Sequence, residues 1–144
     1  MNSISPNLWG RHLWDLLHWI TFNYCGDDLI LQNIIILHIP NLIPCKSCKE
    51  NYLNHIKHYP PDFTSRITLS KWMVKMHNLT NKLLNKKTMS YDKVKIKYVS
   101  EVGRKRVKRS FLKWNEIMRH CTNNSSPAIQ RSYSEFITYL FNNI

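Results

Sequence analysis

Residues 44–49 of the chain are Pro-Cys-Lys-Ser-Cys-Lys, and this stretch decides between the possible folds. A Cys-x-x-Cys pair of the thioredoxin-like kind follows a β-strand inside a β-α-β unit. Here the hydrophobic pattern predicts helices before and after the pair, and no segment is a persuasive strand. The stretch therefore indicates an all-α fold with the two cysteines at the beginning of a helix.

The two cysteines, Cys45 and Cys48, form a reactive pair. A thiol in the first turn of a helix lies close to unsatisfied N–H groups and to the positive end of the helix dipole, which stabilise its thiolate. Lys46 and Lys49 act in the same direction. The pair can exchange disulfides or supply half of a tetrahedral zinc site, and its spacing alone leaves both possibilities open.

The composition of the 144-residue chain indicates a single helical domain. A hydrophobic content of 43% and 12% aromatic residues argue against disorder, and only three glycines argue against an all-β fold. The formal net charge of +12 fits an anionic partner, such as a flavin phosphate, a nucleic acid, an acidic protein or a lipid surface.

Nothing in the sequence predicts secretion or membrane insertion. The N-terminus lacks a basic region followed by an apolar run. Residues 29–43 are rich in isoleucine and leucine, but they are too short and too polar to span a bilayer. We therefore expect an intracellular protein that is not secreted and does not enter a membrane.

The pattern predicts three helices up to the proline pair at residues 60–61. The first is capped by Ser5, with proline at its first position, and continues to about residue 24. The second covers about residues 28–39. The third begins at the cysteine pair and ends near His58, since the prolines stop it.

The second half of the chain contains further helical patterns. A fourth helix is expected from a cap at Ser70 or Thr68 to about residue 85, with an apolar face made of Trp72, Met76, Leu79 and Leu83. A fifth segment begins near Ser90. It is followed by a basic run at residues 103–109, which we interpret as a solvated helix face, and by a last helix after a linker at residues 122–127.

Two helices carry a histidine on a polar and aromatic stripe. His77, Asn81 and Asn85 are spaced by four residues, while Arg11, Trp14 and His18 share one face of the first helix. With cations close by, these stripes suggest a pocket for a flat, anionic ligand rich in heteroatoms, and an adenine dinucleotide has those features.

The zinc hypothesis needs two further ligands, and the nearest are His55 and His58. Six residues separate Cys48 from His55, and only two separate the histidines. Zinc fingers usually have about twelve and three to five residues in these gaps. The spacing therefore favours a solvated helix face for the histidines over metal ligation.

Three stretches together carry a resemblance to a known family. They are residues 9–18 (Trp-Gly-Arg-His-Leu-Trp-Asp-Leu-Leu-His) with Tyr24, residues 44–48, and residues 72–86 (Trp-Met-Val-Lys-Met-His-Asn-Leu-Thr-Asn-Lys-Leu-Leu-Asn-Lys). Their order and spacing resemble the Erv/ALR family of FAD-linked sulfhydryl oxidases. The pattern of that family is G-R-x-x-W-x-x-L-H, then C-x-x-C, then W-x-x-x-x-H-N-x-V-N-x-x-L-x-K.

The chain departs from the family pattern at four points. Thr80 replaces the usual valine, Tyr98 replaces a tryptophan of the flavin pocket, and Lys87 replaces a proline. The additional shuttle cysteine pair of the cellular members is missing. Cys25 and Cys121 form no close motif, so we expect free thiols there, with a second disulfide or an electron relay as the alternative.

The resemblance implies a bundle of four helices plus a shorter crossing fifth helix, with FAD held non-covalently at the mouth of the bundle. It implies a sulfhydryl oxidase core at residues 1–98, which leaves residues 99–144 as a basic helical C-terminal extension packed on or next to the core. It also implies the catalytic residues Cys45 and Cys48. The FAD-binding positions it implies are Gly10, Arg11, Trp14, His18, Tyr24, Cys48, His77, Asn78, Asn81, Asn85, Lys86 and Tyr98.

The activity implied by the resemblance is disulfide formation in protein dithiols. A dithiol would attack the pair at Cys45, and Cys48, at the flavin-proximal position, would pass the electrons through FAD to O2 and give H2O2. A protein dithiol or a small thiol shuttle protein would be the partner, and a homodimer is expected. The short length and the residue usage resemble the versions from large DNA viruses, so the expected location is the host cytoplasm or nucleus and the virion.

Two other classes of function stay open at this point. A zinc-stabilised basic module would bind nucleic acid with the cysteine pair as metal ligands. A helical interaction or virion protein could carry a redox motif that has decayed. Neither needs the residues around His77, and we therefore regard both of these, including nucleic-acid binding, as the weaker hypotheses.

Overall fold

The computed structural model describes all 144 residues, and its only regular elements are helices. These are α1 (Pro6–Phe22), α2 (Leu29–Asn33), a π-helix (Ile34–His38), a 3₁₀-helix (Ile39–Leu42), α3 (Lys46–His58), α4 (Arg66–Leu83), α5 (Tyr91–Val99), α6 (Glu101–Thr122) and α7 (Pro127–Asn143). The prediction of an all-α fold is confirmed.

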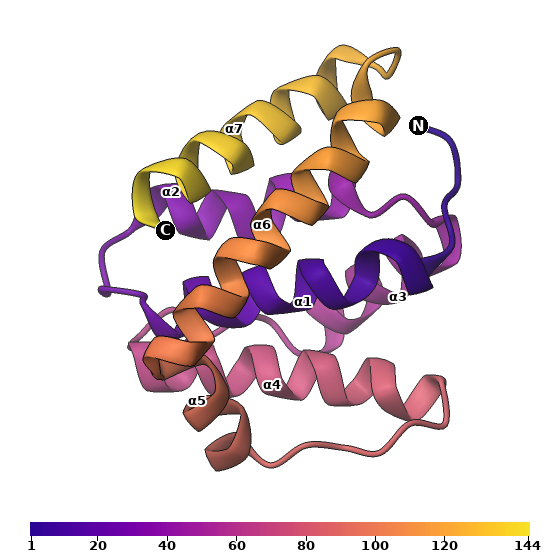
Figure 1. Cartoon of the computed structure of the whole chain (residues 1–144). Helices are drawn as coiled ribbons and strands as arrows, with labels where there is room; N and C mark the ends of the chain where they lie inside the picture. The colour runs from indigo at the N-terminus through magenta and orange to yellow at the C-terminus, as the bar shows by residue number, and fades with distance from the viewer.

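Helix α1 lies at the centre of the molecule (Figure 1). It packs against α4 on one side and α6 on the other, and α5 closes one end between them. Helix α6 runs diagonally across α1 and leads to α7, which lies along the α2, π and 3₁₀ segment. The C-terminal helices therefore cover both α1 and the segment that precedes the cysteine pair.

One continuous hydrophobic core extends through all of these layers. It includes Leu16 of α1 and Met73 of α4, and it continues through Trp114 of α6 and Phe136 of α7, none of which is exposed. The rings of Trp114 and Phe136 meet edge to face with their centroids 5.1 Å apart. Residues 99–144 thus contribute large buried side chains to the same core as the first five helices.

Local sequence signals set most helix starts. The Ser5 hydroxyl caps α1 ahead of Pro6, the Cys45 sulfur caps α3, and the Ser90 hydroxyl caps α5. Each of these starts was predicted.

The predicted start of α4 was wrong. The cap is Ser65, whose hydroxyl accepts a hydrogen bond from the Thr68 N–H at 3.1 Å, while the Thr68 hydroxyl oxygen accepts one from the Ser65 N–H at 3.0 Å. This reciprocal capping box places the helix start before Thr68 and Ser70, the residues we expected to cap it. Ser70 instead lies inside the helix and donates to the Arg66 carbonyl.

The predicted apolar face of α4 is also corrected at its end. Trp72 and Met76 are buried, but the Leu83 side chain is 57% exposed. Asn81, on the predicted polar stripe, is buried instead.

The second predicted helix is shorter than expected. Asp28 caps α2 by accepting a hydrogen bond from the Leu31 N–H at 3.0 Å, but the α-helix ends at Asn33. A π-helical turn and a 3₁₀ turn follow. Pro40 has no N–H to donate to the carbonyl four residues earlier, and its ring would collide with that carbonyl, so the α-helix cannot continue through it.

Candidate functional site

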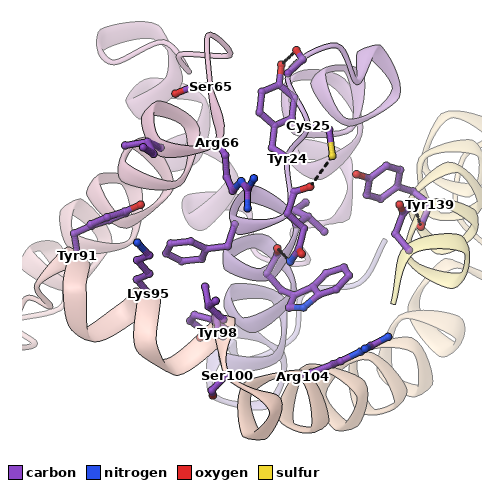
Figure 2. A pocket seen from close by; sticks show the side chains of 18 of the residues that line it. Tyr24, Cys25, Ser65, Arg66, Tyr91, Lys95, Tyr98, Ser100, Arg104 and Tyr139 are labelled. Carbon is purple, nitrogen blue, oxygen red and sulfur yellow. Dashed lines mark hydrogen bonds between the residues drawn. The ribbon is translucent and has the colours of Figure 1, made fainter.

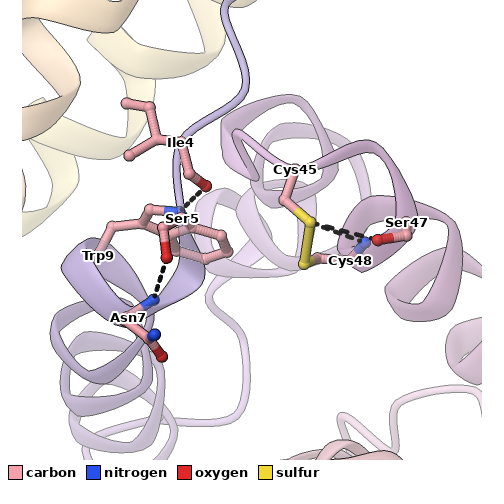
Figure 3. The surroundings of a disulfide bond; sticks show 7 residues. All are labelled: Ile4, Ser5, Asn7, Trp9, Cys45, Ser47 and Cys48. Carbon is pink, nitrogen blue, oxygen red and sulfur yellow. Dashed lines mark hydrogen bonds between the residues drawn. A yellow bond between two sulfur atoms is a disulfide. The ribbon is translucent and has the colours of Figure 1, made fainter.

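The cysteine pair lies at the N-terminus of α3 and forms a disulfide between Cys45 and Cys48 (Figure 3). The Cα atoms are 5.2 Å apart, and the Cys45 sulfur accepts a hydrogen bond of 3.3 Å from the Cys48 N–H. Both cysteines are half-buried. The bond therefore sits where the helix dipole and free N–H groups favour a thiolate once the pair is reduced.

The chain before α1 holds this disulfide region in place. The Ile4 N–H donates to the carbonyl of Pro44, directly before Cys45, at 2.8 Å. The Ile4 carbonyl in turn accepts from the indole N–H of Trp9 at 3.0 Å, as Figure 3 shows. The N-terminal end of α1 is thereby fixed beside the cysteine pair.

Four predicted flavin contacts come together between α1, α4 and α5. The Trp14 and His77 rings stack with centroids 4.1 Å apart and an interplanar angle of 4°. The Nε2 atom of His18 lies 2.8 Å from the Nδ1 atom of His77, and the His18 ring stacks on Tyr98 with centroids 5.1 Å apart. Trp14 and His18 of one predicted stripe therefore meet His77 of the other.

Both histidines of this cluster are neutral at physiological pH. Burial is the main cause that lowers the pKa of His77 to about 4, and nearby Lys97 adds to it. Burial likewise lowers the pKa of the fully enclosed His18 well below its usual value. The His18 Nδ1 atom is buried and has no hydrogen-bond partner, which is costly for a polar atom.

Four further predicted residues, Asn78, Asn81, Asn85 and Lys86, lie on α4 or just beyond its end. The Asn78 amide donates to the Met89 carbonyl and accepts from the Met89 N–H, both at 2.8 Å, so it ties the loop after α4 to the helix. Asn85 adopts a left-handed conformation with φ of 53°. This allows the Lys86 N–H to reach the Asn81 carbonyl at 2.8 Å, which closes the helix.

The remaining predicted residues are spread along α1 and the turn after it. Gly10 is half-buried with open space where a Cβ would lie, and Arg11 is exposed. Tyr24 lies beyond the other end of the helix. Its hydroxyl is within hydrogen-bond reach of the Gly26 and Phe63 carbonyls, and it is not part of the aromatic and imidazole cluster.

A cleft of about 1130 Å³ lies at the C-terminal end of α1 (Figure 2). Tyr24 and Tyr98 are the only predicted flavin contacts that line it. Arg66, Lys95 and Arg104 approach it from three different helices, and none of them forms an ion pair. The cleft is basic, and it lies at the opposite end of α1 from the disulfide.

A buried carboxylate, which the sequence did not predict, lies next to Trp14 in α1. Asp15 is 2% exposed and accepts hydrogen bonds from the Tyr98 and Ser110 hydroxyls, both at 2.6 Å. The Nε atom of Arg106 lies 3.3 Å from each carboxylate oxygen. The only signal in the sequence was an acidic residue between apolar neighbours on a buried helix face.

The zinc hypothesis needs two separate thiolates and two further ligands. In the structure Cys45 and Cys48 are joined to each other, and His58 is exposed. No group of three or more histidine, cysteine or acidic side chains is arranged to hold a metal ion. Cys25 and Cys121 are free thiols, as expected, with Cys25 exposed and Cys121 half-buried.

Comparison with known proteins places the chain in a family. Residues 11–99 match the family model described as Erv1 / Alr, which covers more than half of the chain. The chain belongs to the Erv1/Alr family, as its three sequence motifs suggested.

Three relatives illustrate the similarity. The chain is 28% identical over 95 residues to the probable FAD-linked sulfhydryl oxidase R368 of Acanthamoeba polyphaga mimivirus, covering 61% of this chain and 66% of that protein. It is 33% identical over 91 residues to a protein with the same kind of name, 096R, of Invertebrate iridescent virus 3, covering 58% of this chain and 61% of that one. With the mitochondrial FAD-linked sulfhydryl oxidase ERV1 of Saccharomyces cerevisiae the identity is 31% over 81 residues, covering 54% and 43%. The chain thus spans less than two thirds of the length of these relatives.

Proposed function

We propose that this protein is a FAD-dependent sulfhydryl oxidase that converts pairs of protein thiols into disulfides and passes the electrons to O2, with H2O2 as the product. The observation that carries the proposal is the Cys45–Cys48 disulfide at the N-terminus of α3, in a chain that belongs to the Erv1/Alr family. The relatives with names of FAD-linked sulfhydryl oxidases support it.

The cluster between α1, α4 and α5 has the properties of a flavin site. Trp14, His77 and Tyr98 bring flat rings together in the cluster, and such rings are the side chains on which heteroaromatic ligands stack. His18 has a buried nitrogen without a partner, and a ligand with a polar edge would supply the missing hydrogen bond. Arg11 and Lys86 are exposed and form no ion pair, so they are free to bind phosphates.

We assign the binding of FAD to the positions that the resemblance implied. Aromatic and imidazole side chains would hold the rings, and the basic side chains would hold the pyrophosphate. Asn81 and Asn85 are suited to the polar edges of the adenosine, while Asn78 would act through the loop it holds at Met89. Bound FAD would supply the two-electron acceptor that reoxidises the pair and the route to O2.

The cysteine pair carries out the thiol chemistry. A substrate thiolate attacks the Cys45 sulfur, the bond to Cys48 breaks, and Cys48 leaves as a thiolate at the N-terminus of the helix. The second substrate thiolate then attacks the mixed disulfide and releases Cys45. The substrate has lost two electrons and gained a disulfide, and the pair has gained those electrons as two thiolates, which the N–H groups of the first turn and Lys46 stabilise.

The test is the visible absorption of the purified protein with FAD, before and after a dithiol is added without oxygen. We expect flavin bands that bleach and return in air, with one H2O2 formed per dithiol. The variant Cys48→Ser should keep its yellow FAD and lose turnover, while Cys25→Ser and Cys121→Ser serve as matched controls that keep both. A Cys48→Ser protein that still consumes oxygen with a dithiol would contradict the assignment.

The location and assembly of the protein belong to the same proposal. Relatives from two large DNA viruses support a role in the infected host cell or in the virion. None of the helices is long and apolar enough to cross a membrane. Residues 1–98 would hold the oxidase core and residues 99–144 the extension, and the molecule would act as a homodimer, which the mass of the particle in light scattering would test.

A further inference from the structure

Residues beyond the family match are connected to the aromatic and imidazole cluster by a network of buried hydrogen bonds. The match ends at residue 99, and Arg106 and Ser110 lie beyond it on α6. Both donate hydrogen bonds to Asp15 of α1, and Asp15 also accepts a hydrogen bond from the Tyr98 hydroxyl, with 2.6 Å between the two oxygen atoms. Tyr98, which is predicted to contact the flavin, is thus held by the Asp15 carboxylate, and Arg106 of α6 balances the charge of that carboxylate.

This carboxylate depends on its partners because it is enclosed. The Asp15 side chain is 3% exposed and therefore shielded from water, so protein groups must donate the hydrogen bonds that its carboxylate oxygens accept. Arg106 supplies the compensating charge from a side chain that is 38% exposed. Without Arg106 or Ser110, Asp15 would lose either its counter-charge or one of its two shortest hydrogen bonds, and it would no longer hold the Tyr98 hydroxyl in the same place.

The backbone of α6 also packs directly against the backbone of α5 at Tyr98. A Cβ atom at Gly103 would lie 2.1 Å from the Lys97 carbonyl oxygen and 2.9 Å from the Tyr98 Cα atom. Only glycine permits this approach between α5 and α6. Helix α6 therefore fixes Tyr98 at two points, the backbone through Gly103 and the hydroxyl through Asp15.

The position of Tyr98 determines the position of the cluster beside it. Its ring stacks on His18, whose Nε2 atom bonds to the Nδ1 atom of His77, and His77 stacks on Trp14. Asp15 and Trp14 are neighbours on α1, so these contacts form a ring that runs from Asp15 through Tyr98, His18 and His77 to Trp14. Helix α6 joins this ring at Asp15.

We propose that α6 sets the geometry of the flavin site, with Arg106, Ser110 and Asp15 as positioning residues that act through Tyr98 and His18. None of the three needs to touch the cofactor. The proposal rests on the proposed function, because it assumes that FAD occupies the cluster, and it assigns to the extension a part in cofactor binding.

The test measures the dissociation constant of FAD from the full chain by the change in flavin fluorescence. Arg106→Gln keeps most of the side-chain volume and removes the charge, and we expect it to raise the dissociation constant about tenfold or more. Arg109→Gln, an exposed arginine on the same helix with no bonded partner, is the matched control and should bind FAD as the wild type does. Arg106→Lys restores the charge and should recover most of the affinity.

Two further measurements keep the proposal falsifiable if Arg106→Gln folds poorly. Ser110→Ala removes a single hydroxyl from Asp15 and should weaken FAD binding in the same direction. The absorption bands of the bound flavin should also change in shape, which a loss of stability alone would not cause. Unchanged affinity and spectrum in Ser110→Ala and Arg106→Gln, with a wild type that binds FAD, would overturn this inference alone. A wild type that binds no FAD would overturn the proposed function as well.

Discussion

Replacing Gly103 with alanine should destabilise the protein, although the same change usually favours a helix. A Cβ atom would lie 2.1 Å from the Lys97 carbonyl oxygen, and contacts under 3.0 Å essentially never occur, so the two backbones must separate by about 0.9 Å. The atoms in the way belong to the α5 backbone, which cannot rotate aside as the end of a side chain can.

The magnitude follows from two opposing terms. Overpacking of a close contact costs about 1 to 3 kcal/mol, and a rigid backbone places this site at the upper end. Alanine gains at most about 1 kcal/mol over glycine in a helix, and less in the first turn, where Gly103 lies. We therefore expect Gly103→Ala to lower the free energy of unfolding by about 2 kcal/mol, measured by urea denaturation of the protein without FAD.

Gly10→Ala is the matched control, since Gly10 is also helical but a Cβ there meets nothing within 4 Å. It should raise the stability of the cofactor-free protein by up to about 1 kcal/mol. If Gly10 leaves room for the flavin, the same variant should bind FAD more weakly. A Gly103→Ala protein as stable as the wild type would refute the argument that α5 and α6 touch through their backbones.

Three other predictions test separate parts of the structure. Asn78→Ala removes both hydrogen bonds to Met89 and should cost about 2 kcal/mol in urea denaturation, while Asn51→Ala, exposed and unbonded, should cost little. Because the pKa of His77 is lowered to about 4, the unfolded chain binds more protons than the folded one between pH 6.5 and pH 4. Stability should therefore fall by about 2 to 3 kcal/mol as the pH drops through this window, and a His77→Gln variant should show a flatter profile. A chain that ends at Val99 should fail to fold cooperatively in a thermal melt, since it lacks the partners of the core from α6 and α7. A sharp melting transition in that shorter chain would show that α1 to α5 fold without α6 and α7.

The sequence predicted the helices best where a local signal marks the residue at which a helix begins. A serine before a proline, a cysteine pair after a proline and the serine before Tyr91 each place a cap next to an apolar pattern. The start of α4 was missed because three hydroxyl residues, at 65, 68 and 70, could each cap it. The choice depends on the reciprocal bonds between Ser65 and Thr68, which only the folded backbone reveals.

The candidate site could be predicted in part for a similar reason. Helical spacing shows that Trp14 and His18 share a face with each other, and that His77 and Asn81 share another. It cannot show that the faces meet, which depends on how α1 packs on α4. The family motifs supplied that information, because their order already implied a pocket made by both helices.

Neither the helical pattern nor the family motifs predicted the role of Arg106. It belongs to a run of basic residues, of which Arg104, Lys105, Lys108 and Arg109 are exposed, as a solvated helix face requires. Arg106 differs because α6 crosses α1 in a register that brings it to Asp15, 91 positions earlier in the chain. A run of like charges is therefore not one functional unit. Four of its members face solvent, while the fifth, Arg106, balances the buried charge of Asp15, which holds Tyr98. Arg106 should therefore respond more strongly to substitution than the exposed residues do, and less strongly to added salt. Screening by added salt should weaken contacts of the exposed residues and leave the enclosed pair with Asp15 largely intact.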